Sequence, residues 1–222
     1  MEVLEYLKQF APPGKIELFD ELIEDRTNHL TVVLEDIFQP HNASACVRSC
    51  DCFGVQNAHI IENIHEYEMN PDILVGSAKW VNMEHYNTKK QNTKDCLDKL
   101  KKDGYKIVAT TPLPNTKTIY DFPLDEKIAL VFGNEKDGIS DIVKEEADGF
   151  VTIPMYGFTE SFNISVSVAL CVYEFTKRLH NSDIDWKLSK KEKEESLLYR
   201  VRNSIKNSAW IEKEFLKNRL IK

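Results

Sequence analysis

The sequence contains no long apolar run and no phosphate-binding glycine signature. No stretch of about 18 uninterrupted apolar residues occurs among the 222 residues, so we expect no membrane span. The opening MEVLEYLKQF carries acidic residues where a secretory signal would carry basic ones, which favours a cytoplasmic protein. Neither GxxxxGK followed by Ser or Thr nor GxGxxG is present, which disfavours a nucleotide-dependent kinase or a dinucleotide dehydrogenase.

Paired metal-binding cysteines are also absent. The five cysteines are odd in number, and no CxxC pair is followed by a histidine at ligand spacing. Cys46, Cys50 and Cys52 are close together, but they lie in a stretch that is typical of a helix. We therefore predict buried free thiols in a reducing compartment, and no metal site.

The chain as a whole has no excess of positive charge, but its C-terminal part does. The net charge is −7, whereas residues 187–222 hold eleven Lys or Arg and five Glu, which makes this tail +6 and the rest −13. A basic tail can contact RNA, because phosphate neutralisation depends on local charge. It can equally be the solvated face of a helix, and charge alone leaves both interpretations open.

Apolar runs that alternate with helical stretches predict an α/β fold with a mostly parallel sheet flanked by helices. Two short helices over 2–25, broken by Pro12-Pro13-Gly14, precede this region, and the spacing of Leu198, Val201 and Ile205 predicts an amphipathic helix after it. We divide the chain into a helical extension (1–28), an α/β domain (29–182) and a basic helical extension (183–222). The expected strands are 30–36, 58–62, 106–111, 128–133 and 150–154, and the expected helices of the domain are 42–54, 92–103, 139–147 and 161–180.

Three polar segments follow predicted strands, at the edge where open α/β sheets bind ligands. In PHNASACVRS, Asn42 is positioned to cap a helix, and Arg48 must find either a carboxylate of the body or an anionic partner. In LVFGNEKDGIS, Gly133 and Gly138 flank a loop, which permits either close approach to a ligand or an ordinary connection capped by Asp137 or Ser140.

The third segment, IPMYGFTESFNISVSVAL (153–170), places three serines and Asn163 within an apolar run. Its alternation is that of a strand, but a strand has just ended and no turn follows, so we predict a helix over 161–180. Polar groups in such a run need partners, which a helix start or a ligand can supply.

Together the three segments resemble the three ordered motifs of the SpoU/TrmH group of SPOUT RNA 2′-O-methyltransferases, loosely over residues 29–180. The resemblance implies a deep trefoil knot in the C-terminal part of the domain, S-adenosylmethionine as cofactor, and a homodimer in which an arginine of one subunit completes the site of the other. It implies a cofactor pocket lined by Thr110, Gly133, Ile153, Met155, Phe162 and Asn163.

By the same resemblance, Arg48 matches the catalytic arginine, and the other motif positions are Asn42, Glu135, Ser161 and Asn163. Because a guanidinium is almost always protonated, we expect Arg48 to hold the ribose hydroxyl together with an RNA phosphate. Arg26, Lys177 and Arg178 are the expected RNA contacts.

The short terminal helices look most like those of the transfer-RNA enzymes that methylate a D-loop guanosine, although here the first arm is acidic, with seven acids against three bases through Arg26. Ribosomal RNA or a wobble-position nucleoside is the alternative substrate. A knotted RNA-binding module without catalysis is the alternative from another class.

Overall fold

The computed structural model describes the chain except residues 1, 69, 71, 73–78, 113–115 and 220–222. It divides into two compact units, one formed by Met1–Arg26 with Lys187–Lys222 and the other by Thr27–Trp186. The two extensions that we expected at the ends of the sequence therefore belong to one unit, and the α/β domain is the other.

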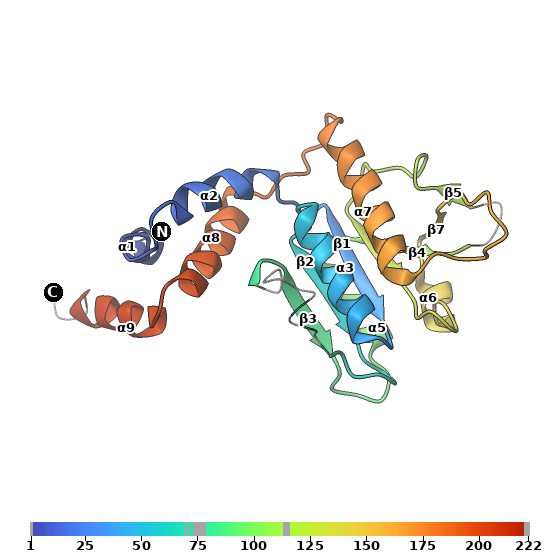
Figure 1. Cartoon of the computed structure of the whole chain (residues 1–222), viewed down its shortest axis with the longest axis horizontal. Coiled ribbons are helices and arrows are strands. Elements are labelled where there is room, and N and C mark those ends of the chain that lie inside the picture. The colour runs from blue at the N-terminus through green and yellow to red at the C-terminus, as the bar shows by residue number, and fades with distance from the viewer. Residues whose placement is uncertain (1, 69, 71, 73–78, 113–115, 220–222) are drawn as a thin grey trace. The chain divides into compact units, whose positions relative to one another are not determined.

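The Thr27–Trp186 unit is built on a seven-stranded, entirely parallel sheet of order β3-β2-β1-β6-β4-β7-β5 (Figure 1). All five predicted strands are present, and β3 and β5 are additional. Polar β3 lies at one edge, where the apolar pattern of a buried strand is not required. The strands are β1 (Leu30–Glu35), β2 (Asn57–Ile61), β3 (Asn82–Tyr86), β4 (Lys106–Thr110), β5 (Lys117–Thr118), β6 (Ile128–Phe132) and β7 (Gly149–Thr152).

Helices cover the two faces of this sheet. On one face α3 (Pro40–Cys52) packs against α7 (Ile164–His180), and on the other α5 (Thr93–Lys102) packs against α6 (Asp141–Glu146). The alternation of β1 divides its side chains between two apolar clusters, with Val32 and Leu34 facing the first pair of helices and Val33 the second. Burial on both faces explains why the strands read as nearly continuous apolar runs.

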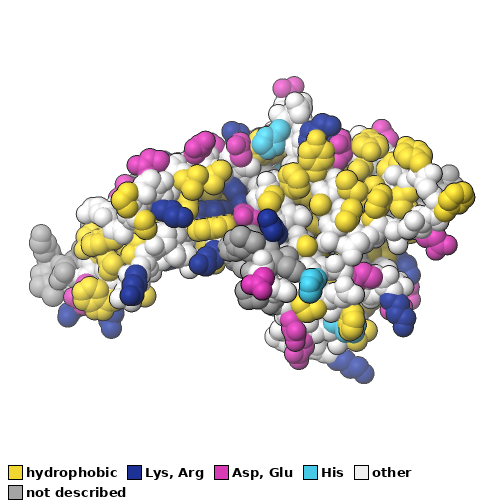
Figure 2. Space-filling model, viewed as in Figure 1, with side chains coloured by type: hydrophobic (Ala, Val, Ile, Leu, Met, Phe, Trp, Pro, Cys, Tyr) yellow, Lys and Arg dark blue, Asp and Glu magenta, His cyan; other side chains and the backbone are white. Residues whose placement is uncertain are grey.

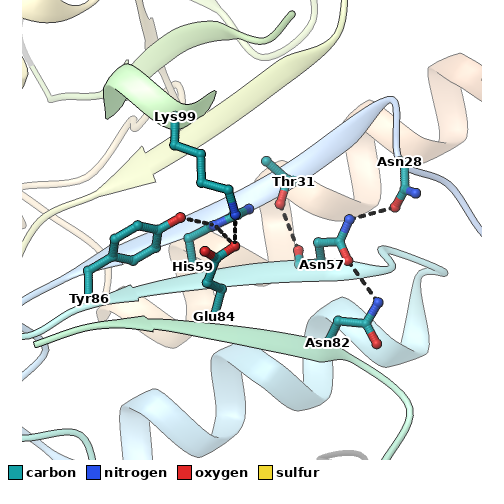
Figure 3. A network of polar contacts seen from close by, with 8 residues as sticks. All are labelled: Asn28, Thr31, Asn57, His59, Asn82, Glu84, Tyr86 and Lys99. Carbon is teal, nitrogen blue, oxygen red and sulfur yellow. Dashed lines mark hydrogen bonds and ion pairs between the residues drawn. The ribbon is translucent and has the colours of Figure 1, made fainter. Parts of the chain in front are cut away.

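A polar network fixes the edge strand β3 (Figure 3). Asn57 donates to Asn28 at 2.8 Å and accepts from Asn82 at 3.0 Å. Further along, the Nδ1 of His59 lies 3.2 Å from the Tyr86 hydroxyl. Burial lowers the pKa of His59 to about 4, although the nearby Glu84 carboxylate acts in the opposite direction. The ring is therefore neutral at pH 7.

The other unit is a small helical assembly of α1 (Glu2–Lys8), α2 (Lys15–Leu22), the 3₁₀ turn η1 (Ile23–Asp25), α8 (Lys190–Ser204) and α9 (Ser208–Arg219). The predicted single tail helix is wrong, because Asn207 adopts the left-handed conformation (φ 61°) and separates α8 from α9. α8 packs against α1 and α2, and α9 against α1, so the tail packs on the first helices of its own chain.

Charge complementarity joins the acidic arm to the basic tail. The Nζ of Lys193 lies 2.7 Å from the Glu24 carboxylate, and Lys187 lies within 4.0 Å of it. The hydrogen bond from Lys193 lowers the pKa of Glu24. The acidity of the arm, unexpected from the family resemblance, thus has a structural use within this unit.

Candidate functional site

The three polar segments meet at the carboxyl edge of the parallel sheet. α3 begins a few residues after β1, the Gly133–Gly138 turn follows β6 directly, and residues 153–163 connect β7 to α7. Because β1 and β6 are neighbours, with Leu34 paired to Phe132, the first two segments leave the sheet side by side. The three segments therefore meet at the edge of the sheet where the sequence predicts them.

Asn42 lies at the centre of this edge, but it is not the helix cap that we predicted. α3 starts earlier, with Gln39 as N-cap and Pro40 in the first turn, where the missing N–H of proline costs nothing. The Asn42 side chain is 7% exposed and its Nδ2 donates to the carboxylate of Glu135 and, at 3.3 Å, to Gln39 Oε1. Burial with these partners fixes the amide in one orientation.

Asn163 links the third segment to Asn42. Its Nδ2 donates to Asn42 Oδ1 at 3.1 Å, while its own Oδ1 accepts from the Ser165 N–H at 2.9 Å and from the Ser165 hydroxyl at 2.6 Å. Asn163 is thus the N-cap of α7. The predicted helix is confirmed, but it begins at Ile164 and not at residue 161, because the Asn163 side chain caps it there. One side chain from each of the three segments joins the series Glu135, Asn42, Asn163.

Arg48 and Ser161 lie outside this series. Both side chains are exposed. Arg48 follows Asn42 by six residues, which at 3.6 residues per turn places it about 120° around α3 from the buried amide. The structure therefore brings together three of the five predicted catalytic residues and places Arg48 on a different side of the helix.

The turn after β6 requires glycine at its first position. The N–H groups of Asn134 and Gly138 each donate to the other's carbonyl at 3.1 Å, and a Cβ at Gly133 would lie 2.0 Å from the Gly138 oxygen. At the end of the turn the Ser140 hydroxyl caps α6, as predicted, by accepting from the Val143 N–H. Gly133 is thus explained by close approach of backbone to backbone.

A buried carboxylate that the sequence pattern does not reveal anchors this turn. Glu35, at the end of β1, is 3% exposed and accepts hydrogen bonds from the Thr93 hydroxyl at 2.6 Å, the Ser140 hydroxyl at 2.8 Å and the Ser140 N–H at 3.0 Å. Its only signal in the sequence is an acid at the end of an apolar strand. The three donors compensate for burying the carboxyl group.

The candidate cofactor residues follow three adjacent strands. Thr110 ends β4, Gly133 follows β6 and Ile153 follows β7, and the register pairs Thr110 with Val151. Thr110, Ile153 and Met155 are partly buried, and Phe162 is 41% exposed. These uncharged side chains and free strand ends suit a ligand with an aromatic base and an aliphatic chain, so the residues fit S-adenosylmethionine.

Two of the three expected RNA contacts have other surroundings. Arg26 is 5% exposed. The guanidinium of Arg178 donates to the Ile119 and Phe122 carbonyls at 2.7 and 2.6 Å, which ties α7 to the segment after β5. Lys177 is exposed, 3.5 Å from Glu174, and remains a candidate for RNA contact.

Some functional classes find no support in the described part of the chain. No helix there is long and apolar enough to cross a membrane. The same residues contain no group of three or more His, Cys, Asp or Glu side chains placed to hold a metal ion.

Comparison with known proteins agrees with the resemblance. Residues 29–173 match the SpoU rRNA Methylase family. The chain is 41% identical over 206 residues, 93% of each chain, to the tRNA (guanosine(18)-2′-O)-methyltransferase of Borreliella burgdorferi. Its fold matches the A. aeolicus TrmH/SpoU tRNA modifying enzyme with a TM-score of 0.75 and 30% identity, over 90% of this chain and 99% of that one.

A more distant structure extends the match in fold. The SpoU methyltransferase AviRb of Streptomyces viridochromogenes, solved in complex with AdoMet, matches with a TM-score of 0.60 and 21% identity, over 73% of this chain and 62% of that one. The α/β architecture and the grouping expected from the three motifs are both confirmed. The chain belongs to the SpoU rRNA methylase family.

Proposed function

We propose that this protein methylates the ribose 2′-oxygen of a D-loop guanosine in tRNA, using S-adenosylmethionine. The observation that carries the proposal is the hydrogen-bonded series Glu135, Asn42, Asn163, which joins the three family segments at one edge of the sheet. The tRNA substrate is supported by the relative from B. burgdorferi, which is named for this reaction and aligns over 93% of the chain.

When bound, S-adenosylmethionine would supply a methyl group on a positively charged sulfur: the S–CH3 bond breaks as the O–CH3 bond forms, the sulfur leaves as a neutral thioether, and the 2′-hydroxyl proton passes to water. Thr110, Gly133, Ile153 and Met155, at or just after the ends of β4, β6 and β7, would hold it together with Phe162, which lies just before α7. This chain must then orient the 2′-hydroxyl and stabilise the negative charge that develops on its oxygen.

The polar residues divide that work. Asn42 and Asn163 form a fixed amide pair, and Glu135, exposed and bonded to Asn42, presents a carboxylate to the substrate side. Ser161 offers a hydroxyl two residues before Asn163. Arg48 supplies the cation that holds the hydroxyl against an RNA phosphate, since its guanidinium is a poor base.

We further propose a homodimer in which Arg48 acts in the partner's site. α7 exposes Val166 and Tyr173, and Phe162 lies just before the helix, with exposed fractions of 42%, 48% and 41%. Figure 2 shows that hydrophobic side chains gather over α7 and the segment that precedes it. Because α3 packs against α7, the exposed Arg48 belongs to the same layer of the domain as this apolar surface.

Substitution of Arg48 tests the catalytic assignment. Arg48→Ala should nearly abolish turnover and leave S-adenosylmethionine affinity close to that of the wild type, and Arg48→Lys should rescue little, because lysine lacks the planar fork. Lys144→Ala, an exposed cation on α6, is the matched control. Unchanged turnover in Arg48→Ala would refute the role.

Mixed dimers test the composite site. Arg48→Ala subunits should be nearly inactive and Asn163→Ala subunits should be slowed. Mixed dimers of the two should turn over faster than either parent, because one of the two sites then receives both intact residues. Absence of recovery in a verified mixed dimer would contradict the shared site.

The substrate is tested by mapping ribose methylation in tRNA and ribosomal RNA from cells with and without the protein. Loss of one D-loop guanosine methylation is the expected result. Loss at a wobble nucleoside or in ribosomal RNA would select the alternative substrate. No change, together with no affinity for S-adenosylmethionine, would favour a binding module. A tRNA-modifying role also accords with the cytoplasmic location that we propose.

A further inference from the structure

An exposed aromatic ring just before the first polar segment has no role in the site described above. Phe38 lies between β1 and α3 and is 64% exposed, whereas its neighbour Ile37 is 6% exposed. The next residue, Gln39, accepts a hydrogen bond from Asn42. Phe38 is therefore attached directly to the loop that holds the central amide of the site.

A second ring lies against Phe38. The imidazole of His65 meets it edge to face, with ring centroids 5.0 Å apart and planes at 67°. Ile64, the residue before His65, is 77% exposed. Single exposed apolar side chains are common, but here two rings pack together next to the residues that hold Asn42, and exposed Ile64 adjoins one of them in the sequence.

A buried carboxylate builds this arrangement. Asp36 is 6% exposed and adopts the left-handed conformation (φ 52°). It accepts hydrogen bonds from the backbone N–H groups of Asn63 at 2.7 Å, Ile64 at 2.8 Å and His65 at 3.4 Å. The turn that carries His65 is thus fixed to the same strand end from which Phe38 emerges.

The charge around the two rings selects the kind of ligand. Glu66 and Glu68 follow His65 and are exposed, and the Thr27–Trp186 unit holds 15 Lys or Arg against 24 Asp or Glu. The two carboxylates beside the rings disfavour a phosphate at this position. An uncharged base that is unstacked from its neighbours can instead lie on an aromatic ring, which is how proteins hold bases of single-stranded RNA loops.

We propose that Phe38, supported by His65, is a stacking platform for an unpaired base of the RNA, next to the ribose that is methylated. The inference rests on the proposed function and adds a specificity-determining contact to it. It assigns Phe38 to the substrate, not to the cofactor or to the subunit interface.

Three variants separate stacking from simple apolar contact. Phe38→Leu keeps apolar volume without a ring, Phe38→Tyr keeps the ring, and Tyr120→Leu removes an aromatic of similar exposure (55%) elsewhere in the unit. Base stacking on an aromatic ring predicts that Phe38→Leu lowers kcat/KM for tRNA by about 5-fold to about 100-fold. Phe38→Tyr and Tyr120→Leu should stay within about 2-fold of the wild type, and S-adenosylmethionine affinity should not change in any variant.

A readout without methyl transfer accompanies the kinetics. In tRNA carrying 2-aminopurine at the D-loop guanosine, binding of the wild type should change the fluorescence of the probe as its base restacks, and Phe38→Leu should lose that change. If the wild type changes the fluorescence of the probe but transfers no methyl group to tRNA, the proposed function fails and the stacking platform stands. If Phe38→Leu matches the wild type in both readouts, or if it converts a dimer to monomers, the platform is refuted.

Discussion

Asn163 carries two roles that a pair of substitutions can separate. Its Oδ1 caps α7 by accepting from Ser165, and its Nδ2 donates to Asn42. Asn163→Ala removes both functions. Asn163→Asp keeps the capping acceptor, because Asp and Asn are equally good N-caps, but it loses the donor and places a carboxylate opposite the Asn42 carbonyl.

The two roles have different magnitudes. Loss of the cap in Asn163→Ala should cost about 1 kcal/mol of unfolding free energy, and a chain of this size then loses about 2–4 °C in Tm. Asn163→Asp keeps the cap and loses only the hydrogen bond to Asn42, so it should melt above Asn163→Ala. A lost side-chain hydrogen bond is worth about 0.5–1.5 kcal/mol, so misplacement of the amide pair should lower methyl transfer by up to about 10-fold in both variants, and repulsion from Glu135 should lower it further in Asn163→Asp.

Thermal unfolding followed by circular dichroism measures the first effect, and transfer of labelled methyl groups to tRNA measures the second. Wild-type activity in Asn163→Asp would show that the capping acceptor alone is needed. The proposed positioning of Asn42 by Asn163 would then be wrong.

Three further predictions concern thiols, pH and the helical unit. Cys52 is exposed and the other four thiols are buried, with burial raising the pKa of Cys171 to about 12, so a thiol reagent should label one cysteine quickly in the native chain and five after unfolding. The pKa of His59 is about 4 in the fold and about 6.5 in the unfolded chain, so its contribution to stability is present above pH 6.5 and is lost as the pH falls toward 4. The free energy of unfolding measured with urea should therefore be about 2 kcal/mol lower at pH 5 than at pH 7.5. His59→Gln should remove most of that difference. Leu7 is fully buried within the helical unit, so Leu7→Ala should lower the free energy of unfolding of that unit by about 2–5 kcal/mol. Amide hydrogen exchange should become faster in α1, α8 and α9 but not in the sheet. Equal acceleration in both units would contradict the division of the chain.

The sequence predicts the sheet well because burial on both faces leaves a local signal. Strands such as β1 and β6 are short apolar runs bounded by turn residues, and each lies close to its predicted bounds. β3 carries no such signal, because its side chains are half-buried at an edge and are held by partners such as Lys99 that are distant in the sequence. Edge strands of this kind are recognised only when their neighbours are known.

The site was predictable in its residue types but not in its geometry. Asn42 has the side chain of a helix cap, and only the position of Pro40 and the approach of Glu135 and Asn163 show that its amide links two other segments. Arg178 has the charge of an RNA contact, but two carbonyls more than 50 residues away hold it. Long-range hydrogen bonds decide both cases, and a single sequence does not record them. The trefoil knot stays a prediction for the same reason.

The most direct test of the proposed function uses the resistance of a methylated ribose to alkali, because strand cleavage by hydroxide requires a free 2′-hydroxyl. Purified protein is incubated with S-adenosylmethionine and an unmodified tRNA transcript, and the RNA is then hydrolysed and resolved by length. One alkali-resistant linkage, directly after a D-loop guanosine, is the result that we predict. Methyl incorporation without any resistant linkage would place the methyl group on a base and would contradict ribose 2′-O-methylation.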